Sequence, residues 1–318
     1  MSAEASASTS TSTPVRILVI NPNTSQHMTD ALKPVLEDLR IPSVEYTFFT
    51  SPSPGIASIN SPDDAAKSAD ICLPALVPLL AHHDAFLVAC YSQHPLVPRL
   101  KAECRKLLLP TFGAGAGAAV TATVTAGSRE RGSEGRGEGR GEGEGARKYV
   151  TGIFEASVLT SLGLIDEHEG FGIVSTGKIW ESALQSAVEQ FLGYGSNSSD
   201  DNNDGSPSRF YGCETTGLNA SELHDLPGEE VRNKMMDATK RLLERGAGAA
   251  YSTNVDSGNG ESRTKAICLG CAGMVGLEDA VRQACVEYLG PAAAKEVCII
   301  DGVKAGVVLL CSLARTGF

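Results

Sequence analysis

Short apolar segments alternate with amphipathic segments along most of the chain. In the amphipathic type, as in residues 178–192 and 277–289, apolar side chains recur every three or four positions. Strands that alternate with helices in this way are typical of an α/β protein with mainly parallel sheets, which is the fold that we predict. The predicted buried strands are residues 15–20, 85–90, 171–176, 266–271 and 297–301.

Four stretches lack the apolar side chains that a packed core requires. Residues 1–14 are rich in Ser and Thr, and residues 113–148 pass from Gly–Ala repeats into alternating Arg, Glu and Gly. Residues 195–208 and 246–264 are polar and rich in small side chains. We predict a disordered tail, a low-complexity insert and two flexible loops at these four places.

These interruptions divide the remaining chain into two lobes. The first is predicted to span residues 15–112 and to be joined by a C-terminal helix at 302–315, and the second spans residues 149–301. Each lobe contains a predicted strand that ends in a cysteine, Cys90 in the first and Cys271 in the second. Because ligands of parallel sheets bind beyond the carboxyl ends of the strands, we predict a cleft between pseudo-symmetric lobes with one thiol on each wall.

A thiol between a strand end and a helix start faces unpaired backbone N–H groups, which lower its pKa. Both Cys90 and Cys271 have this setting, although each could instead be a small buried apolar residue. His94 could serve Cys90 as a base, or could simply begin a helix. Cys268 and Cys271 form a CxxC motif without the second pair that a zinc ribbon requires, so we expect no metal.

The net charge of the chain limits the kinds of partner that we expect it to bind. The net charge is −11 and the isoelectric point is about 5.1, which argues against nucleic acid and anionic membranes. No apolar run approaches the roughly 18–20 residues that span a bilayer, and no export signal precedes the first strand. We therefore expect a cytoplasmic protein with reduced cysteines and a small-molecule substrate.

Four motifs resemble the hydantoin racemase branch of the aspartate/glutamate racemase superfamily. They are Ile-Asn-Pro-Asn-Thr-Ser at 20–25, Ala-Cys at 89–90, Gly-Ile-Phe-Glu-Ala at 152–156 and Leu-Gly-Cys-Ala-Gly-Met at 269–274. They occur in the family's order and extend over about residues 15–315. Residues 91–95 depart from the Phe-Gly-Asp-Pro of hydantoin racemases, and the sequence looks closer to fungal members of the family.

The resemblance implies two flavodoxin-like lobes, a mechanism without a cofactor, a possible homo-oligomer, and catalytic roles for Cys90 and Cys271. It also implies that Asn21 and backbone amides near both thiols anchor the substrate. Together with the strand-end positions, it predicts a larger set of substrate contacts: Asn21, Asn23, Thr24, Ser25, Tyr91, Ser92, Glu155, Ser175, Thr176, Ala272 and Gly273.

Two thiols on opposite walls can invert a carbon next to a carbonyl, because one removes a proton while the other returns one. We therefore predict a racemase of a 5-substituted hydantoin or an allantoin-like ureido compound. One alternative within the superfamily is an amino-acid racemase, a maleate-type isomerase or a decarboxylase. A further alternative is a protein that binds small metabolites without catalysis.

Overall fold

The computed structural model describes residues 13–108, 146–193, 208–251 and 262–318. Nearly all of the predicted tail, of the predicted insert and of the loop predicted at 195–208 lies outside these residues. Among the described residues, no helix is both long and apolar enough to cross a bilayer.

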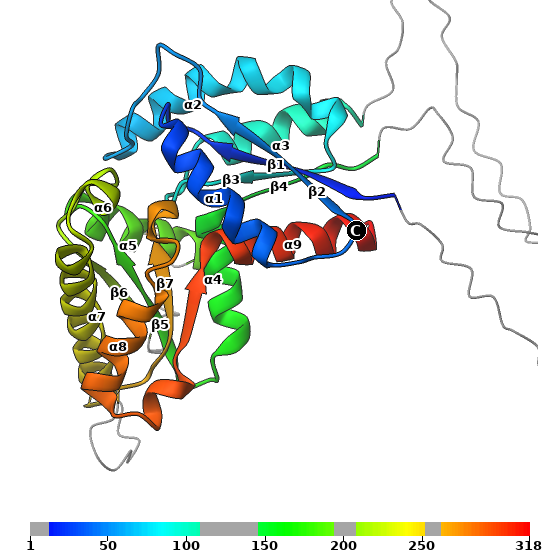
Figure 1. Cartoon of the computed structure of the whole chain (residues 1–318). Coiled ribbons are helices and arrows are strands. Elements are labelled where there is room, and N and C mark those ends of the chain that lie inside the picture. Colours follow the sequence, from blue (N-terminus) through cyan, green and yellow to red (C-terminus); the bar gives the residue numbers. More distant parts are fainter. Residues whose placement is uncertain (1–12, 109–145, 194–207, 252–261) are drawn as a thin grey trace, which may run out of the picture.

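Two four-stranded parallel sheets form the two lobes, which confirms the predicted α/β fold (Figure 1). The strand order is β2-β1-β3-β4 in the first sheet and β6-β5-β7-β8 in the second, so the two sheets have equivalent topology. The first contains β1 (Val15–Asn21), β2 (Val44–Thr50), β3 (Ala85–Val88) and β4 (Tyr149–Gly152). The second contains β5 (Gly170–Ser175), β6 (Phe210–Thr215), β7 (Thr264–Gly270) and β8 (Cys298–Asp301).

Helices cover both faces of each sheet. Those of the first lobe are α1 (Gln26–Asp38), α2 (Pro62–Leu76), the 3-10 helix η1 (Val77–His82) and α3 (Leu96–Lys106). Those of the second are α5 (Ile179–Leu192), α6 (Glu222–Asp225), α7 (Gly228–Tyr251), η2 (Ala272–Met274), α8 (Glu278–Leu289) and η3 (Ala293–Glu296).

Two further helices, α4 (Ile153–Leu164) and α9 (Gly302–Thr316), tie the lobes together. Helix α4 leaves the first sheet after β4 and packs against β7 and β8 of the second. Helix α9 leaves the second sheet after β8 and packs against β1, β3 and β4 of the first. The two helices lie side by side at the centre of the molecule, so each lobe is completed by a helix from the other (Figure 1).

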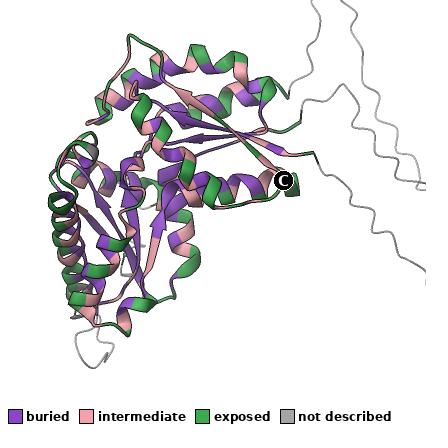
Figure 2. Ribbon diagram, viewed as in Figure 1, coloured by how far each residue is buried: buried purple, intermediate pink, exposed green. Residues whose placement is uncertain are grey.

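One buried cluster extends through this junction. It contains Val19 and Leu87 from the first sheet, Phe154 from α4, Ile173 from the second sheet and Val307 from α9. Figure 2 shows most strands of the two sheets and the inward faces of these helices as buried, with exposed residues on the outer helix faces and on β2. Since apolar burial stabilises by about 25 cal/mol per Å², this shared core holds the lobes in a fixed relation.

Strands β2, β4 and β6 are absent from the sequence prediction. Strand β4 lies at residues 149–152, which we assigned to the second lobe, but it pairs with β3 of the first through the partners Val88 and Gly152. That boundary is therefore wrong by one strand. Strand β2 alternates between half-buried and exposed residues through its first part, because it lies at an edge of its sheet.

The loop predicted at 246–264 is wrong at both ends. Helix α7 continues to Tyr251, and β7 begins at Thr264. A Cβ at Gly246 would meet the side-chain oxygens of Thr264 and Ser262, so this glycine permits close packing of the helix on the strand. Composition alone does not distinguish glycine used for close packing from glycine in a flexible loop.

Candidate functional site

The carboxyl ends of the two sheets place Cys90 and Cys271 in equivalent positions. Cys90 follows β3 and Cys271 directly follows β7, the third strand of each lobe in chain order. Both cysteines are half-buried, and the negative charge of a Cys271 thiolate raises the pKa of Cys90. The turn η2 after Cys271 also packs against α1 of the first lobe. The two predicted thiols are therefore close enough for the charge of one to change the pKa of the other.

Burial dominates the titration of Cys90. It raises the pKa of the thiol to about 12, with further increases from the charges of Cys271 and Glu155. The Ser92 hydroxyl lies 3.7 Å from the sulfur and acts in the opposite direction. In this state of the protein, Cys90 is a thiol rather than a thiolate at neutral pH.

Cys271 has a milder environment. Its Sγ accepts a hydrogen bond from the backbone N–H of Gly273 at 3.4 Å, which favours the thiolate, but burial still raises the pKa to about 11. The predicted net lowering of both pKa values is therefore wrong, although the Gly273 N–H acts in the predicted direction at Cys271. The loss of hydration on burial exceeds the stabilisation that one amide or hydroxyl supplies.

Glu155 lies beside Cys90 at the same sheet edge. It occupies the first turn of α4, and Oε2 is buried with no hydrogen-bond partner among the described groups. Burial raises the pKa of this carboxyl, while the backbone N–H groups of Glu155 and Gly152 and the charge of Lys101 lower it.

The polar segment after β1 forms one closed network. The Asn21 amide donates to Asn23 Oδ1 at 2.9 Å, to the Ser25 carbonyl at 3.0 Å and to Thr29 Oγ1 at 3.0 Å. Ser25 in turn caps α1 by accepting from the Met28 N–H. The Asn21 side chain thus holds this loop in shape through its hydrogen bonds, whereas we predicted that it contacts the substrate directly.

Two neighbouring residues of this loop make fewer hydrogen bonds than Asn21. Thr24 is half-buried, and its backbone N–H donates to the Ile56 carbonyl at 2.9 Å. Asn23 is buried, accepts from the Ser25 N–H, and donates its amide to the Met28 sulfur, a weak acceptor.

Ser175 and Thr176 lie at the corresponding point of the second sheet and are buried. The Ser175 hydroxyl donates to the Gly270 carbonyl at 2.8 Å, which fixes the end of β7 immediately before Cys271. The Thr176 carbonyl accepts from the Gly217 N–H at 3.0 Å. Both residues support the loops around the site, and Ala272 and Gly273 form the turn that follows Cys271.

Tyr91 and His94 point into the interior. The Tyr91 hydroxyl lies 2.7 Å from Ser157 Oγ on α4, so its placement does not support the predicted substrate contact. His94 Nδ1 accepts from the Leu96 N–H, which leaves Nε2 to donate to Ser68 Oγ at 3.0 Å. Both ring nitrogens of His94 are engaged in hydrogen bonds, so this histidine is not a base for Cys90.

The CxxC sulfurs also face different surroundings. Cys268 is buried against α4, with Ser161 Oγ at 3.1 Å, whereas Cys271 caps η2. Within the described part of the chain, no group of three or more His, Cys, Asp or Glu side chains could hold a metal ion.

Comparison with known proteins identifies the family. The family profile described as Asp/Glu/Hydantoin racemase matches residues 17–129. The uncharacterized protein C1F7.10 of Schizosaccharomyces pombe is 33% identical over 301 residues, which cover 95% of this chain and 92% of that protein. The chain belongs to the Asp/Glu/hydantoin racemase family.

Solved structures with the same fold include two allantoin racemases. The enzyme from Pseudomonas fluorescens superposes with a TM-score of 0.60 at 21% identity, covering 96% of this chain and 92% of that chain. The enzyme from Klebsiella pneumoniae gives a TM-score of 0.59 at 22% identity, covering 96% and 89%. These similarities establish the two-lobe racemase fold.

Ser51 lies near the candidate site but was not predicted from the sequence. Ser51 follows β2 and is buried, and its N–H donates to the carbonyls of Asn21 and Asn23 at 3.1 Å. It therefore holds the loop after β1 in place. The alternation of polar and apolar residues at 44–50 is the signal that could have revealed β2 and the turn beyond it.

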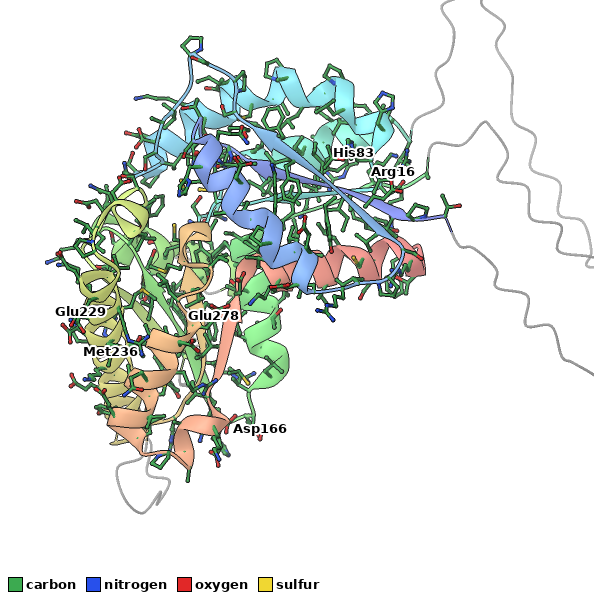
Figure 3. All side chains as sticks on the ribbon, viewed as in Figure 1. Arg16, His83, Asp166, Glu229, Met236 and Glu278 are labelled. Atoms are coloured by element: carbon green, nitrogen blue, oxygen red, sulfur yellow. The ribbon has the colours of Figure 1, made fainter. Side chains whose placement is uncertain are left out.

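A hollow of about 800 Å³ lies away from the thiols, between α4, α8, β8 and α9. It contains the ion pair of Lys304 with Glu278, whose Nζ–Oε1 distance is 2.7 Å, and Figure 3 shows Glu278 on this side of α8. Arg16 and His83 lie at the amino end of the first sheet, where Arg16 Nη2 is 3.2 Å from Asp84 Oδ1. Neither Cys90 nor Cys271 lines the hollow, although Asp301 at the carboxyl end of β8 does.

Proposed function

We propose that the chain racemises a 5-substituted hydantoin or an allantoin-like ureido compound without a cofactor. One observation carries the proposal: equivalent points of two equivalent sheets supply one cysteine each, and their thiols interact across the junction of the lobes. Family membership supports a racemase or isomerase, and two neighbours in fold are named allantoin racemases.

The proposed reaction needs one thiolate and one thiol. The thiolate takes the proton from the chiral carbon and becomes a thiol, while the C–H electron pair passes into the adjacent carbonyl as an enolate. The opposite thiol then donates its proton to the other face of that carbon and becomes the thiolate. No net proton is gained or lost, and the pair is left in the complementary protonation state.

The two environments suggest which thiol ionises first. Cys271 receives the Gly273 N–H, whereas Cys90 experiences the negative charge of Glu155. We propose Cys271 as the first thiolate. Preorganised donors stabilise the enolate oxygen in other enzymes, and we propose that a backbone N–H at the start of η2 does so here.

The test is polarimetry of single enantiomers of 5-substituted hydantoins, allantoin and amino acids, with deuterium incorporation at the chiral carbon in D2O. Cys90→Ala and Cys271→Ala should each lower racemisation by at least about a thousandfold, since proton-transfer groups contribute about 10²–10⁴ each. Racemisation that persists in either variant would contradict the proposal. Deuterium uptake also separates a racemase from a decarboxylase, because only the racemase returns its substrate with an exchanged C–H.

Cys298→Ala is the matched control. Cys298 is also half-buried, but it lies at the amino end of β8, at the edge opposite the thiol pair. Its replacement should leave the racemisation rate unchanged.

A further inference from the structure

Glu155 has a position in the site that its role in the fold does not explain. Gly152 ends β4 directly beside Val88 of β3, and the chain reaches Glu155 and Cys90 a few residues beyond these partners. Adjacent parallel strands end at the same edge, so the carboxyl and the thiol are neighbours. Glu155 Oε2 lies so close over Gly152 that a Cβ there would collide with it.

The Glu155 carboxyl uses only part of its capacity to accept hydrogen bonds. Backbone N–H groups at the start of α4 act on it, as expected for an acid in the third position of a helix. Nevertheless Oε2 has lost its solvent contact, and no donor among the described groups replaces the lost water. A buried acceptor without a partner costs about 1–3 kcal/mol, and more when it is charged. A ligand that brings an N–H group to this oxygen would recover that free energy.

The charges around the thiols point to the kind of ligand. Within the described chain, the groups that shift the pKa values of Cys90 and Cys271 are Ser92, Glu155, the Gly273 N–H and the partner thiol, and none of them is a cation. Lys101 acts on Glu155 from α3. A free amino acid would bring a carboxylate for which none of these groups supplies a positive charge, whereas a hydantoin or ureide ring is neutral and carries N–H donors.

We propose that Glu155 accepts a hydrogen bond from a ring N–H of the substrate and thereby selects neutral cyclic or linear ureides over free amino acids. This inference rests on the proposed function and specifies its substrate class. Glu155 then acts by binding and orienting the ring, so that the C–H bond lies between the two sulfurs. Proton transfer itself remains with the cysteines.

The experiment measures dissociation constants, which do not require turnover. The probes are 5-methylhydantoin, its N1-methyl and N3-methyl derivatives, and alanine. In the unmodified protein, one of the two N-methyl derivatives should bind at least about tenfold more weakly than the parent, since a charge-assisted hydrogen bond contributes about 1.5–3 kcal/mol. Alanine should bind more weakly than 5-methylhydantoin.

Replacing Glu155 should remove this discrimination. Glu155→Met has no acceptor, so the parent and the N-methyl derivative should bind equally, within about twofold. Glu155→Gln keeps the shape and the helix-capping ability of the side chain, and should reduce the discrimination while remaining folded.

A second buried acid gives a control. Asp301 ends β8, as Gly152 ends β4, and its Oδ1 caps α9 through the N–H groups of Val303 and Lys304. Its Oδ2, like Glu155 Oε2, has no hydrogen-bond partner among the described groups. Asp301→Asn keeps this cap and should leave the N-methyl discrimination intact. A discrimination that is as large in Glu155→Gln and Glu155→Met as in the unmodified protein would overturn the inference, as would no binding of 5-methylhydantoin. If the discrimination depends on Glu155 but polarimetry shows no racemisation, the binding role stands and the proposed reaction fails.

Discussion

In both lobes a cysteine follows the third strand of a sheet whose strands run in the same order. The surroundings of the two thiols nevertheless differ. Cys90 has Ser92 at 3.7 Å and the Glu155 carboxyl nearby, whereas Cys271 receives the Gly273 N–H at 3.4 Å. The shared topology therefore sets the position of each sulfur and burial raises both pKa values, while the residues just beyond each strand account for the difference between the two thiols.

Two buried acids near the ends of the last strands differ in their surroundings. Asp301 ends β8 and caps α9, and its Oδ2 lies 3.9 Å from Lys304 Nζ, so a cation offsets its charge. Glu155 lies in the first turn of α4, beyond the end of β4, and the charge of Lys101 acts on it. Each acid keeps one buried oxygen, Asp301 Oδ2 and Glu155 Oε2, with no hydrogen-bond partner among the described groups. What distinguishes Glu155 is its neighbour, because its charge raises the pKa of the Cys90 thiol.

The first prediction separates the lobes by the face of the substrate that each serves. Cys90→Ala and Cys271→Ala should each retain C–H exchange with deuterium for one enantiomer and lose it for the other by at least about a hundredfold. The remaining thiol can remove a proton from its own face and return a deuteron there. Chiral chromatography with mass spectrometry measures this, and loss of the same enantiomer in both variants would show that the thiols do not face opposite sides.

The second prediction concerns acid stability, because the turn after Cys90 contains a buried histidine. Burial, with a contribution from Arg99, lowers the pKa of His94 to about 4 from its ordinary 6.5. The unfolded chain therefore binds a proton that the folded chain excludes, so stability falls as pH drops from 6.5 to 4. The loss approaches about 3 kcal/mol, at 1.36 kcal/mol per pKa unit.

Urea unfolding at several pH values measures this loss, and His94→Gln supplies the comparison. The variant should be less stable at neutral pH but should lose less on acidification. Glu155 and Asp301 have raised pKa values and act in the opposite direction, so only the difference between the two proteins reports on His94. An identical pH dependence in both would contradict the assignment.

The third prediction compares the loops after the first strand of each lobe. Asn21→Ala removes hydrogen bonds to Asn23, Ser25 and Thr29 in a buried place and should lower the free energy of unfolding by about 2–3 kcal/mol. Ser175→Ala removes the single bond to the Gly270 carbonyl and should cost about 1 kcal/mol. Urea denaturation measures both, and equal losses would mean that the first loop is no more dependent on side chains than the second.

The sequence contained enough to predict the alternating fold and the strand-end positions of both cysteines. Those features follow from long apolar runs such as residues 15–20 and 266–271, which have few alternative structures. Edge strands were harder, because β2 buries little surface and β6 begins beside a stretch of polar residues. The prediction began a loop at Gly246 and therefore ended helix α7 too early. Gly246 lies against β7, but the sequence alone does not distinguish such a glycine from one in a loop.

Site chemistry was less predictable than position. The strand-end rule accounts for where the thiols lie, but their pKa values depend on how much surface the opposite lobe covers. The interior use of Tyr91 likewise depends on Ser157 of α4, a residue far along the chain that packs across the junction. Properties that arise from contacts between the lobes cannot be read from either segment alone.

The last prediction tests the acidity difference directly. Because burial raises the pKa of Cys271 to about 11 and that of Cys90 to about 12, the thiolate fraction below pH 10 should be higher at Cys271. Iodoacetamide should therefore modify Cys271 faster than Cys90, and both rates should rise about tenfold for each pH unit between 7 and 9. Peptide mass spectrometry of briefly treated protein gives the two rates. Faster modification of Cys90 would reverse the assignment of the first thiolate, because the sulfur facing Glu155 would then be the more acidic of the pair despite that carboxyl.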